Sequence, residues 1–372
     1  MKTAERAALV VREASENDAT CWDSFVNDHG GSFFHYFDWR EIYALRGFRY
    51  IPLMLEDASG SLLGILPLVV EQGKLYTSLV SLPEGASGGI VLRRDLPTEE
   101  RTPAVKALLA YAAEHYAQAC STFRIKANLA EEHDGSQVHQ GLVESGFSPV
   151  FGEDSQLPCT HILTLDQPFE ERIWRDLWSQ KVRKSIGKIR DLGVEIVHDT
   201  TLAYADIFTE MLAHTYQRHG NQPPTRDEVE MRLTRFAGRS DLFIALLGER
   251  AVGGLLCYYT PTTCYLSKLP SYADERTGYN NILLEYHGIK HACDAGYRYV
   301  EFGITDTMPL LHWKNRFKGT VIPLSVYERK FSSVRACLRY TASISADLWQ
   351  NRSNLKNMVQ YNVRRLSART KE

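Results

Sequence analysis

One stretch near the end of the chain collects residue types that could do chemistry. Residues 296–319 read GYRYVEFGITDTMPLLHWKNRFKG, in which a predicted strand ends at a glycine. A polar loop with Asp306 follows, and then Trp313, Lys314 and Phe317 place a cation between two aromatic side chains. A cation flanked by aromatics just past a strand end suits recognition of an activated acyl group or a phosphate better than core packing.

The composition is that of a globular protein with more than one core. The chain has 372 residues, of which 44% are hydrophobic and 24% charged, with a net charge of −2. This length predicts two domains, and the charge gives no global attraction to nucleic acid or lipid. No signal peptide and no run of about 18 apolar residues is visible, so no membrane span is expected. Seven scattered cysteines without C-x-x-C fit reduced thiols in the cytoplasm.

The two halves of the sequence repeat one order of elements. In the first, SLLGILPLVV and KLYTSLVSLP predict two strands, Pro103 opens a helix through Ala119, and TFRIKAN is a further strand. In the second, RAVGGLLCYYT and TCYLSKLP predict the strand pair, Asn280 or Asn281 caps a helix that Gly296 ends, and YRYVEFG follows. A helix that crosses to a late strand predicts a mixed α/β sheet in each half.

Helical segments precede the strands in both halves. Apolar residues at helical spacing mark residues 22–27, 39–45, 204–218 and 226–237. A helix over residues 138–145 and the strand THILTLD are expected to close the first unit. The predicted division is residues 1–166, residues 167–331, and a helical basic tail over residues 332–372.

Two other motifs suggest chemistry that their context argues against. Residues 85–89 read G-x-S-x-G, but a strand (GIVLRR) follows in place of the helix that a hydrolase nucleophile needs. We interpret this stretch as a glycine-rich connection where backbone can approach a ligand closely. His287 and His291, with Cys293 nearby, could bind a metal or could be a satisfied histidine pair, and the spacing is not that of a zinc enzyme. We expect no metal and no bound cofactor.

The run from Trp174 to Arg190 is basic. Lys181, Arg183 and Lys184 lie among apolar residues at helical spacing. This pattern fits either a solvated basic face or a helix that contacts the phosphates of a nucleotide, a coenzyme or tRNA.

Taken in order, these segments resemble the Fem-type aminoacyltransferases and related tandem-domain members of the GNAT acyltransferase superfamily. The resemblance covers roughly residues 33–330. It rests on FFHYFDWREI, SLLGILPLVV and SLPEGASGGIVL in the first half, and on WSQKVRKSIGKIRDLGVEI, GYRYVEFG and LHWKNRFKG in the second. Trp313 stands where the family usually has phenylalanine, and Lys318 where it has glycine. No sequence for the helical arm of cell-wall Fem enzymes is visible.

The resemblance implies two tandem GNAT-like acyltransferase domains that form an amide from an amine and an activated acyl group. Lys314 would hold a donor phosphate or neutralise the oxyanion, and Trp313 would wall the acyl channel. Phe317 would contact the substrate, and Asp306 would accept the amine proton or orient the nucleophile. Alternatively, Lys314 is a surface lysine packed on two aromatics and Asp306 caps a turn.

Further contacts follow from the same resemblance. Tyr36, Trp39 and Lys268 are expected to contact the substrate. The donor phosphates would meet Asn280, Asn281, Lys181, Arg183 and Lys184, although capping alone also explains the two asparagines. The co-substrate would be aminoacyl-tRNA or, as the alternative, acyl-CoA, with a small-molecule or precursor amine as acceptor. A third hypothesis is a non-catalytic binding module with a degenerate site.

Overall fold

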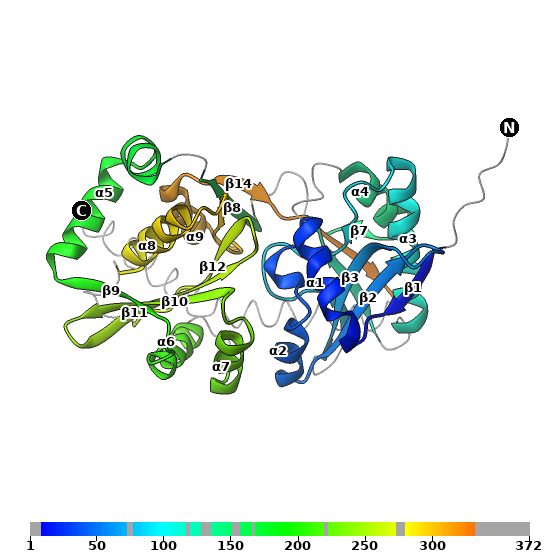
Figure 1. Ribbon diagram of the computed structural model, residues 1–372, viewed down its shortest axis with the longest axis horizontal. Coiled ribbons are helices and arrows are strands. Elements are labelled where there is room, and N and C mark those ends of the chain that lie inside the picture. The colour runs from blue at the N-terminus through cyan, green and yellow to red at the C-terminus, as the bar shows by residue number, and fades with distance from the viewer. Residues whose placement is uncertain are drawn as a thin grey trace, which may run out of the picture.

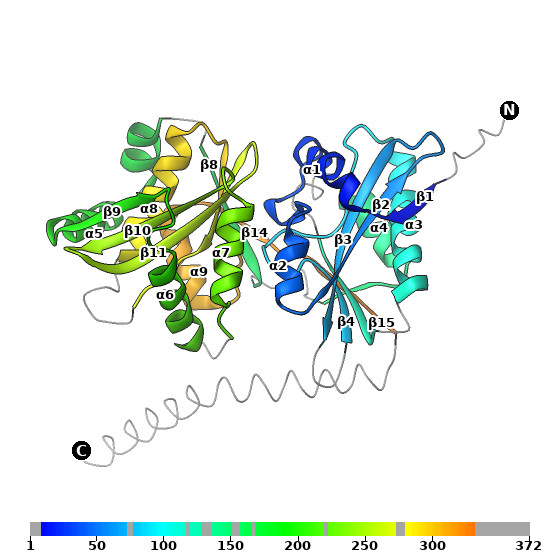
Figure 2. The same ribbon diagram turned by 60° about the horizontal axis from the view of Figure 1, so that its bottom comes forward.

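The computed structural model describes residues 9–72, 77–116, 120–127, 135–150, 157–165, 168–218, 222–272 and 280–331. These residues form two halves that lie side by side, each built on a mixed sheet with helices packed against it (Figure 1, Figure 2). Within these ranges one sheet has eight strands and the other seven. The predicted mixed α/β class is confirmed.

The sheet of the first half runs in the order β1-β2-β3-β4-β6-β15-β7, with β5 paired to β3. Its strands are β1 (Val10–Glu13), β2 (Arg49–Glu56), β3 (Leu62–Gln72), β4 (Thr77–Ser81), β5 (Val91–Leu92), β6 (Thr122–Lys126), β7 (Ser148–Pro149) and β15 (Val326–Lys330). Its helices are α1 (Ala19–Asp28), α2 (Trp39–Leu45), α3 (Thr98–Tyr116) and α4 (Gly135–Glu144).

The sheet of the second half runs in the order β14-β8-β13-β12-β11-β10-β9. Its strands are β8 (Cys159–Thr164), β9 (Val194–Asp199), β10 (Ser240–Leu247), β11 (Arg250–Tyr259), β12 (Thr263–Lys268), β13 (Tyr299–Glu301) and β14 (Thr320–Pro323). A π-helical segment (Phe169–Leu177) precedes the helices α5 (Gln180–Asp191), α6 (Ala205–Arg218), α7 (Arg226–Arg235), α8 (Asn280–Asp294) and α9 (Met308–Lys314).

Most predicted helices occur where their apolar spacing places them. Helix α1, for example, buries Trp22, Phe25 and Val26, which share one helical face. Two boundaries are wrong. Helix α3 begins at Thr98, so Pro103 lies inside the helix and does not open it. Helix α8 already includes Asn280, so neither Asn280 nor Asn281 is its cap.

Each half contains one parallel strand pair at the centre of its sheet. Strand β4 pairs with β6 from Ser78↔Thr122 to Ser81↔Ile125. Strand β12 pairs with β13 from Thr263↔Tyr299 to Tyr265↔Glu301. In both halves a long helix, α3 or α8, connects the two parallel strands, as the repeated order of elements predicts.

The two halves exchange strands. Strand β8, which contains most of the THILTLD segment, was expected to close the first unit, but it pairs with β13 and β14 of the second sheet. Strand β15 returns from the end of the second half to pair with β6 and β7 of the first sheet. The proposed boundary after residue 166 and the tail over residues 332–372 lie outside the described residues. Each sheet therefore depends on chain from both sides of that boundary.

An aromatic core joins the two halves. The ring of Phe33 from the first half stacks on Tyr258 of the second, with centroids 4.2 Å apart and planes 6° from parallel. Trp39 packs against Phe236 with ring centroids 5.3 Å apart. All four side chains belong to one buried cluster, so the halves share a core.

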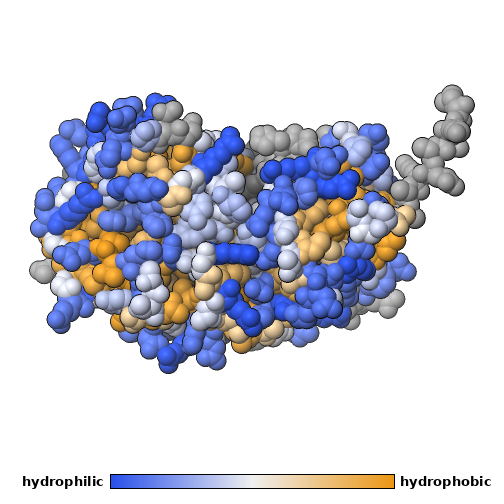
Figure 3. Space-filling model, in the orientation of Figure 1, coloured by the Kyte–Doolittle hydropathy of each residue, from blue (hydrophilic) through white to orange (hydrophobic). Residues whose placement is uncertain are grey.

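The outer surface is mostly polar on the face shown in Figure 3, with apolar residues visible within each half. Over the described ranges, every helix is too short or too polar to cross a lipid bilayer.

A candidate active site between the two halves

A cleft of about 650 Å³ lies where the two halves meet. The first half contributes the end of α2 with Arg46 and the loop from Pro83 to Gly85. The second half contributes the connection between α6 and α7 and the ends of β12 and β13. This volume is in the range of small-molecule sites, which often occur between domains.

The parallel strands β12 and β13 separate at this cleft. Their pairing ends at Tyr265↔Glu301, and the residues beyond it, including Ser267 and Gly303, line the cleft. Gly303 has a φ of 72°, a conformation that glycine adopts without strain, directly after the end of β13. Residues beyond the last pair on both strands therefore line the cleft.

Glu301 occupies the point of separation. Its side chain lines the cleft, although the residue is only 3% exposed. Its Oε1 accepts hydrogen bonds from the Thr160 hydroxyl and, at 2.8 Å, from the Gly303 amide. Burial raises the pKa of Glu301, while the hydrogen bond from Thr160 and the charge of Lys314 oppose that rise. A carboxyl with a raised pKa in a cleft is a candidate acid or base.

The sequence patterns do not single out Glu301, because it lies within the predicted strand YRYVEFG. The available signal was a single acidic residue at the end of a strand, directly before Phe302 and Gly303. Such a residue is rarely buried unless it has partners or a role.

Lys314 lies behind the cleft wall and not at the surface. It is 6% exposed, and its Nζ donates to the carbonyls of Gly303 and Ile304 at 2.9 Å each. Burial lowers its pKa, while Glu301 and Glu285 oppose that change. The alternative of a surface lysine packed on two aromatics is wrong, because Lys314 holds the bend of the chain that follows Glu301.

Trp313 and Phe317 do not line the cleft either. The indole N–H of Trp313 donates to Glu285 at 2.9 Å. Phe317 is fully buried, and its ring packs against Trp178 with centroids 5.5 Å apart. Asp306 is exposed and lies outside the residues that line the cleft. The residues predicted as one constellation are thus divided between the interior and the surface.

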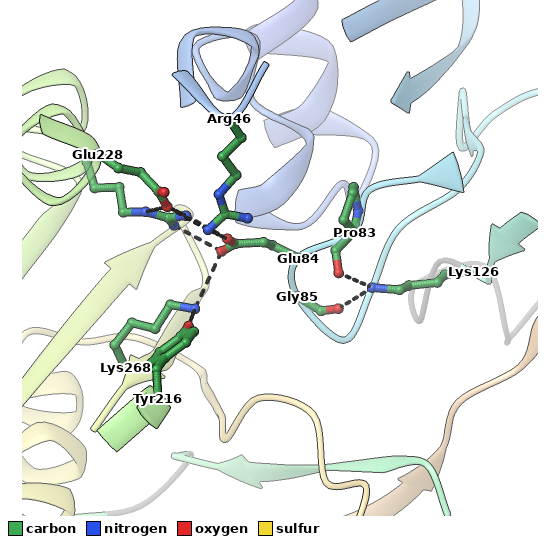
Figure 4. A network of polar contacts seen from close by, with 9 residues as sticks. Arg46, Pro83, Glu84, Gly85, Lys126, Tyr216, Glu228 and Lys268 are labelled. Carbon is green, nitrogen blue, oxygen red and sulfur yellow. Dashed lines mark hydrogen bonds and ion pairs between the residues drawn. The ribbon is translucent and has the colours of Figure 1, made fainter. Parts of the chain in front are cut away.

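A buried ion-pair network crosses between the halves next to the cleft (Figure 4). Arg232 of α7 is 2% exposed, and its Nη2 donates to Glu84 Oε1 and Glu228 Oε1 at 2.6 Å each. Arg46 Nη2 lies 2.7 Å from Glu84 Oε1 and 2.5 Å from Glu228 Oε1. The network ties the first half's Glu84 to the second half.

Lys268 completes this network on the cleft side. Its Nζ donates to the Tyr216 hydroxyl at 2.9 Å and lies 3.7 Å from Glu84 Oε2. Burial alone would raise the pKa of Glu84, but the charges of Arg232, Lys268 and Arg46 hold it well below its usual range. Lys268 lines the cleft, and its contact with a substrate stays a prediction.

Comparisons with known proteins identify a domain family in the second half. Residues 178–318 match the model of the acetyltransferase (GNAT) domain family. The second half contains a GNAT domain. This is an acyltransferase domain, and the site at Glu301 lies within it. No curated protein matches the chain.

Solved structures extend the GNAT likeness to both halves. A structure of FemX has a TM-score of 0.65 at 15% identity, covering 85% of this chain and 96% of that one. A tandem GNAT protein from the clavulanic acid biosynthesis pathway has a TM-score of 0.52 at 13% identity, covering 88% and 99%. L-PGS from Bacillus licheniformis has a TM-score of 0.55 at 10% identity, covering 88% and 95%. At these identities the likeness shows the fold, a tandem GNAT fold.

The other predicted substrate residues lie in the interior. Trp39 is fully buried in the aromatic core between the halves. Tyr36 is 1% exposed, and its hydroxyl donates to Asn27 at 2.5 Å. Neither residue lines the cleft between the two halves.

The residues predicted for donor phosphates are dispersed over the GNAT domain. Lys181 and Lys184 are exposed on α5, which lies at the outer end of the second half (Figure 1, Figure 2). Arg183 instead donates from Nη1 to three carbonyls at the end of the preceding π-helical segment, among them that of Trp178 at 2.8 Å. Asn280 is 2% exposed in α8, and Asn281 follows it.

The structure also bears on the two other motifs, the histidine pair and the G-x-S-x-G stretch. His291 Nε2 lies 3.1 Å from Asp241 Oδ2, and burial lowers the pKa of His287 to about 4. In the part of the chain that the structure describes, no three potential ligands are grouped to hold a metal ion. The G-x-S-x-G stretch leads into β5, so its serine has no nucleophile elbow.

The buried Glu285 should make the stability of the GNAT domain depend on pH. It is 3% exposed, and burial raises its pKa from 4.5 to about 8. The folded state therefore holds a proton that the unfolded state releases, and stability falls as pH rises from about 4.5 through 8. Glu285→Gln should remove this slope, at most about 1.4 kcal/mol per pH unit. Urea unfolding between pH 6 and 9 measures this slope.

Glu195→Gln serves as the control, because Glu195 is exposed, and it should keep the wild-type slope. An unchanged slope in Glu285→Gln would contradict the assignment of the pH dependence to Glu285.

Proposed function

We propose that the protein is an N-acyltransferase that forms an amide in the cleft between its two halves. The observation that carries this proposal is the position of Glu301, a buried carboxyl with a raised pKa at the point where β12 and β13 separate. An acyl group lying along the separated strands would meet an amine held next to Glu301.

The reaction needs one base and one set of oxyanion donors. The amine nitrogen attacks the acyl carbon, and Glu301 takes the proton that the amine loses. Backbone N–H groups on the separated strands stabilise the negative oxygen of the tetrahedral intermediate. The bond between the acyl carbon and the donor's sulfur or ribose oxygen then breaks, this leaving group takes the proton held by Glu301, and the amide remains.

Lys314 has a positioning role in this scheme. By bonding the carbonyls of Gly303 and Ile304 it orients the backbone that follows Glu301. Its ammonium also lowers the pKa of Glu301 and so limits the effect of burial. We place Glu301, and not the exposed Asp306, as the base because Glu301 lines the cleft.

We propose aminoacyl-tRNA as the first donor to test. The exposed Lys181 and Lys184 on α5 support it, because an extended nucleic acid needs cationic contacts away from the reacting end. The fold shared with FemX is consistent with this choice. Acyl-CoA is the second candidate, favoured by the GNAT acetyltransferase model that matches residues 178–318. Both donors occur in the cytoplasm, where we propose that the protein acts.

Parallel assays separate these candidates. The full chain is incubated with radiolabelled aminoacyl-tRNA or acetyl-CoA and a pool of amines, and amide products are identified by mass spectrometry. Transfer from aminoacyl-tRNA supports the first donor, and transfer from acetyl-CoA alone supports the second. No transfer from either donor, with Lys314→Ala changing only ligand affinity, would favour a non-catalytic binding module.

A further inference from the structure

The two parallel strand pairs of the molecule end differently. In the second half, the chain beyond Tyr265 and Glu301 faces the cleft on both strands. In the first half, β4 and β6 end their pairing at Ser81↔Ile125. The space beyond that pair is filled by the protein itself.

A glycine connection enters the gap of the first half. A Cβ on Gly88 would lie 3.2 Å from the Ser81 carbonyl oxygen and 3.5 Å from Cβ of Lys126, so Gly88 sits between the two strand ends. A Cβ on Gly89 would lie only 2.1 Å from the Lys126 carbonyl oxygen. The glycines predicted to approach a ligand closely instead approach their own chain.

The side chain of Lys126 then crosses the same gap. Its Nζ donates to the carbonyl of Pro83 at 3.0 Å and to that of Gly85 at 2.9 Å (Figure 4). Lys126 thus joins the end of β6 to the loop after β4, on the opposite side of the gap. Lys314 makes a similar pair of bonds in the second half, but to the loop that follows β13.

We propose that Lys126 is a positioning residue that closes the strand gap of the first half and holds the Pro83–Gly85 loop as a fixed wall of the cleft. The donor then enters only the second half, and each chain has one transfer site. The part concerning the donor rests on the proposed function.

Lys126 acts through Glu84, which lies between the two carbonyls that it binds. The carboxylate of Glu84 extends to the other side of the loop, where Arg232 and Lys268 hold it. The loop is therefore anchored on the first half by Lys126 and on the second half by Glu84. Loss of the first anchor should let Glu84 shift, and Lys268 would move with it at the substrate side of the cleft.

The charge of Lys126 sets the pH range of this anchor. Burial lowers its pKa to about 8, opposed by the carboxylates of Glu84, Glu71 and Glu301. Above that pH the ammonium loses its proton and its bonds to the two carbonyls weaken. An arginine at the same position stays charged.

Hydrogen exchange tests the anchor without any substrate. In Lys126→Met the amides of residues 84–89 should exchange about ten-fold faster or more than in wild type. Lys106→Met, at an exposed position paired with Glu144, should leave them unchanged. Equal exchange of residues 84–89 in wild type and Lys126→Met would overturn the proposal, whether or not a donor is known.

Kinetics separate positioning from mere stability. With the amine found in the transfer assay, Lys126→Met should raise KM about ten-fold while kcat changes less. Wild-type KM should rise above pH 8, and Lys126→Arg should delay that rise. Native mass spectrometry with the donor that the transfer assay identifies should show one molecule bound per chain. Two bound molecules, or cross-linking to the first half, would overturn the single site. If no donor is used at all, the proposed function fails, and the exchange result alone decides the role of Lys126.

Discussion

Replacing Glu301 with glutamine should lower kcat by about 10²- to 10⁴-fold, with little change in KM. Glutamine keeps the shape of the side chain, and its carbonyl oxygen can still accept the bonds from Thr160 and Gly303. It cannot take a proton from the amine. The loss should therefore appear in the chemical step, measured as the steady-state or single-turnover rate of amide formation with the donor that the transfer assay identifies.

The pH profile distinguishes a lost base from a distorted site. Because burial raises the pKa of Glu301, kcat/KM of the wild type should increase with pH above the usual carboxyl range as Glu301 loses its proton. Glu301→Gln should lack this limb. Asp306→Asn is the discriminating variant, since Asp306 was the base predicted from sequence. A large loss of kcat in Asp306→Asn together with normal kcat in Glu301→Gln would contradict the assignment.

Local patterns in the sequence predicted the elements well. Alternating or continuous apolar runs such as SLLGILPLVV and RAVGGLLCYYT are strands β3 and β11, and the helix that joins the parallel strands recurs in both halves. The exchange of β8 and β15 was not predictable in this way. A strand's own residues show which face is buried but carry little information about which distant strand it pairs with.

Sequence patterns are equally limited in predicting where the side chains of the site lie. Trp313, Lys314 and Phe317 look like a surface constellation in sequence, but α9 buries Lys314 and the 3-10 helix Asn315–Phe317 buries Phe317. Lys268, in contrast, was expected at the substrate and lines the cleft. Glu301 could not be ranked above other acids, because its burial, which raises its pKa, and its hydrogen bond from Thr160 arise only when distant parts of the chain come together.

The largest effect on stability is expected for Arg232→Met, which should lower the free energy of unfolding by about 3–5 kcal/mol at pH 7. Arg232 is 2% exposed and binds the carboxylates of both Glu84 and Glu228. Without it, two buried carboxylates share only Arg46 and the more distant Lys268. Urea unfolding monitored by tryptophan fluorescence measures the loss.

Partner variants and pH test the cause of that loss. Arg232→Met combined with Glu84→Gln and Glu228→Gln should recover much of the stability, because the unpaired charges are then absent. Arg226→Met, whose arginine pairs with Asp206 at the exposed surface, should cost less than about 1 kcal/mol.

The low pKa of Glu84 in the wild type gives the second test. The contribution of Glu84 to the free energy of unfolding is present above its unfolded pKa and is lost as pH falls. The difference between wild type and Arg232→Met should therefore shrink at pH 4. A difference that stays constant with pH, or no recovery in the triple variant, would mean that Arg232 stabilises the halves by packing on Trp39 and not by charge.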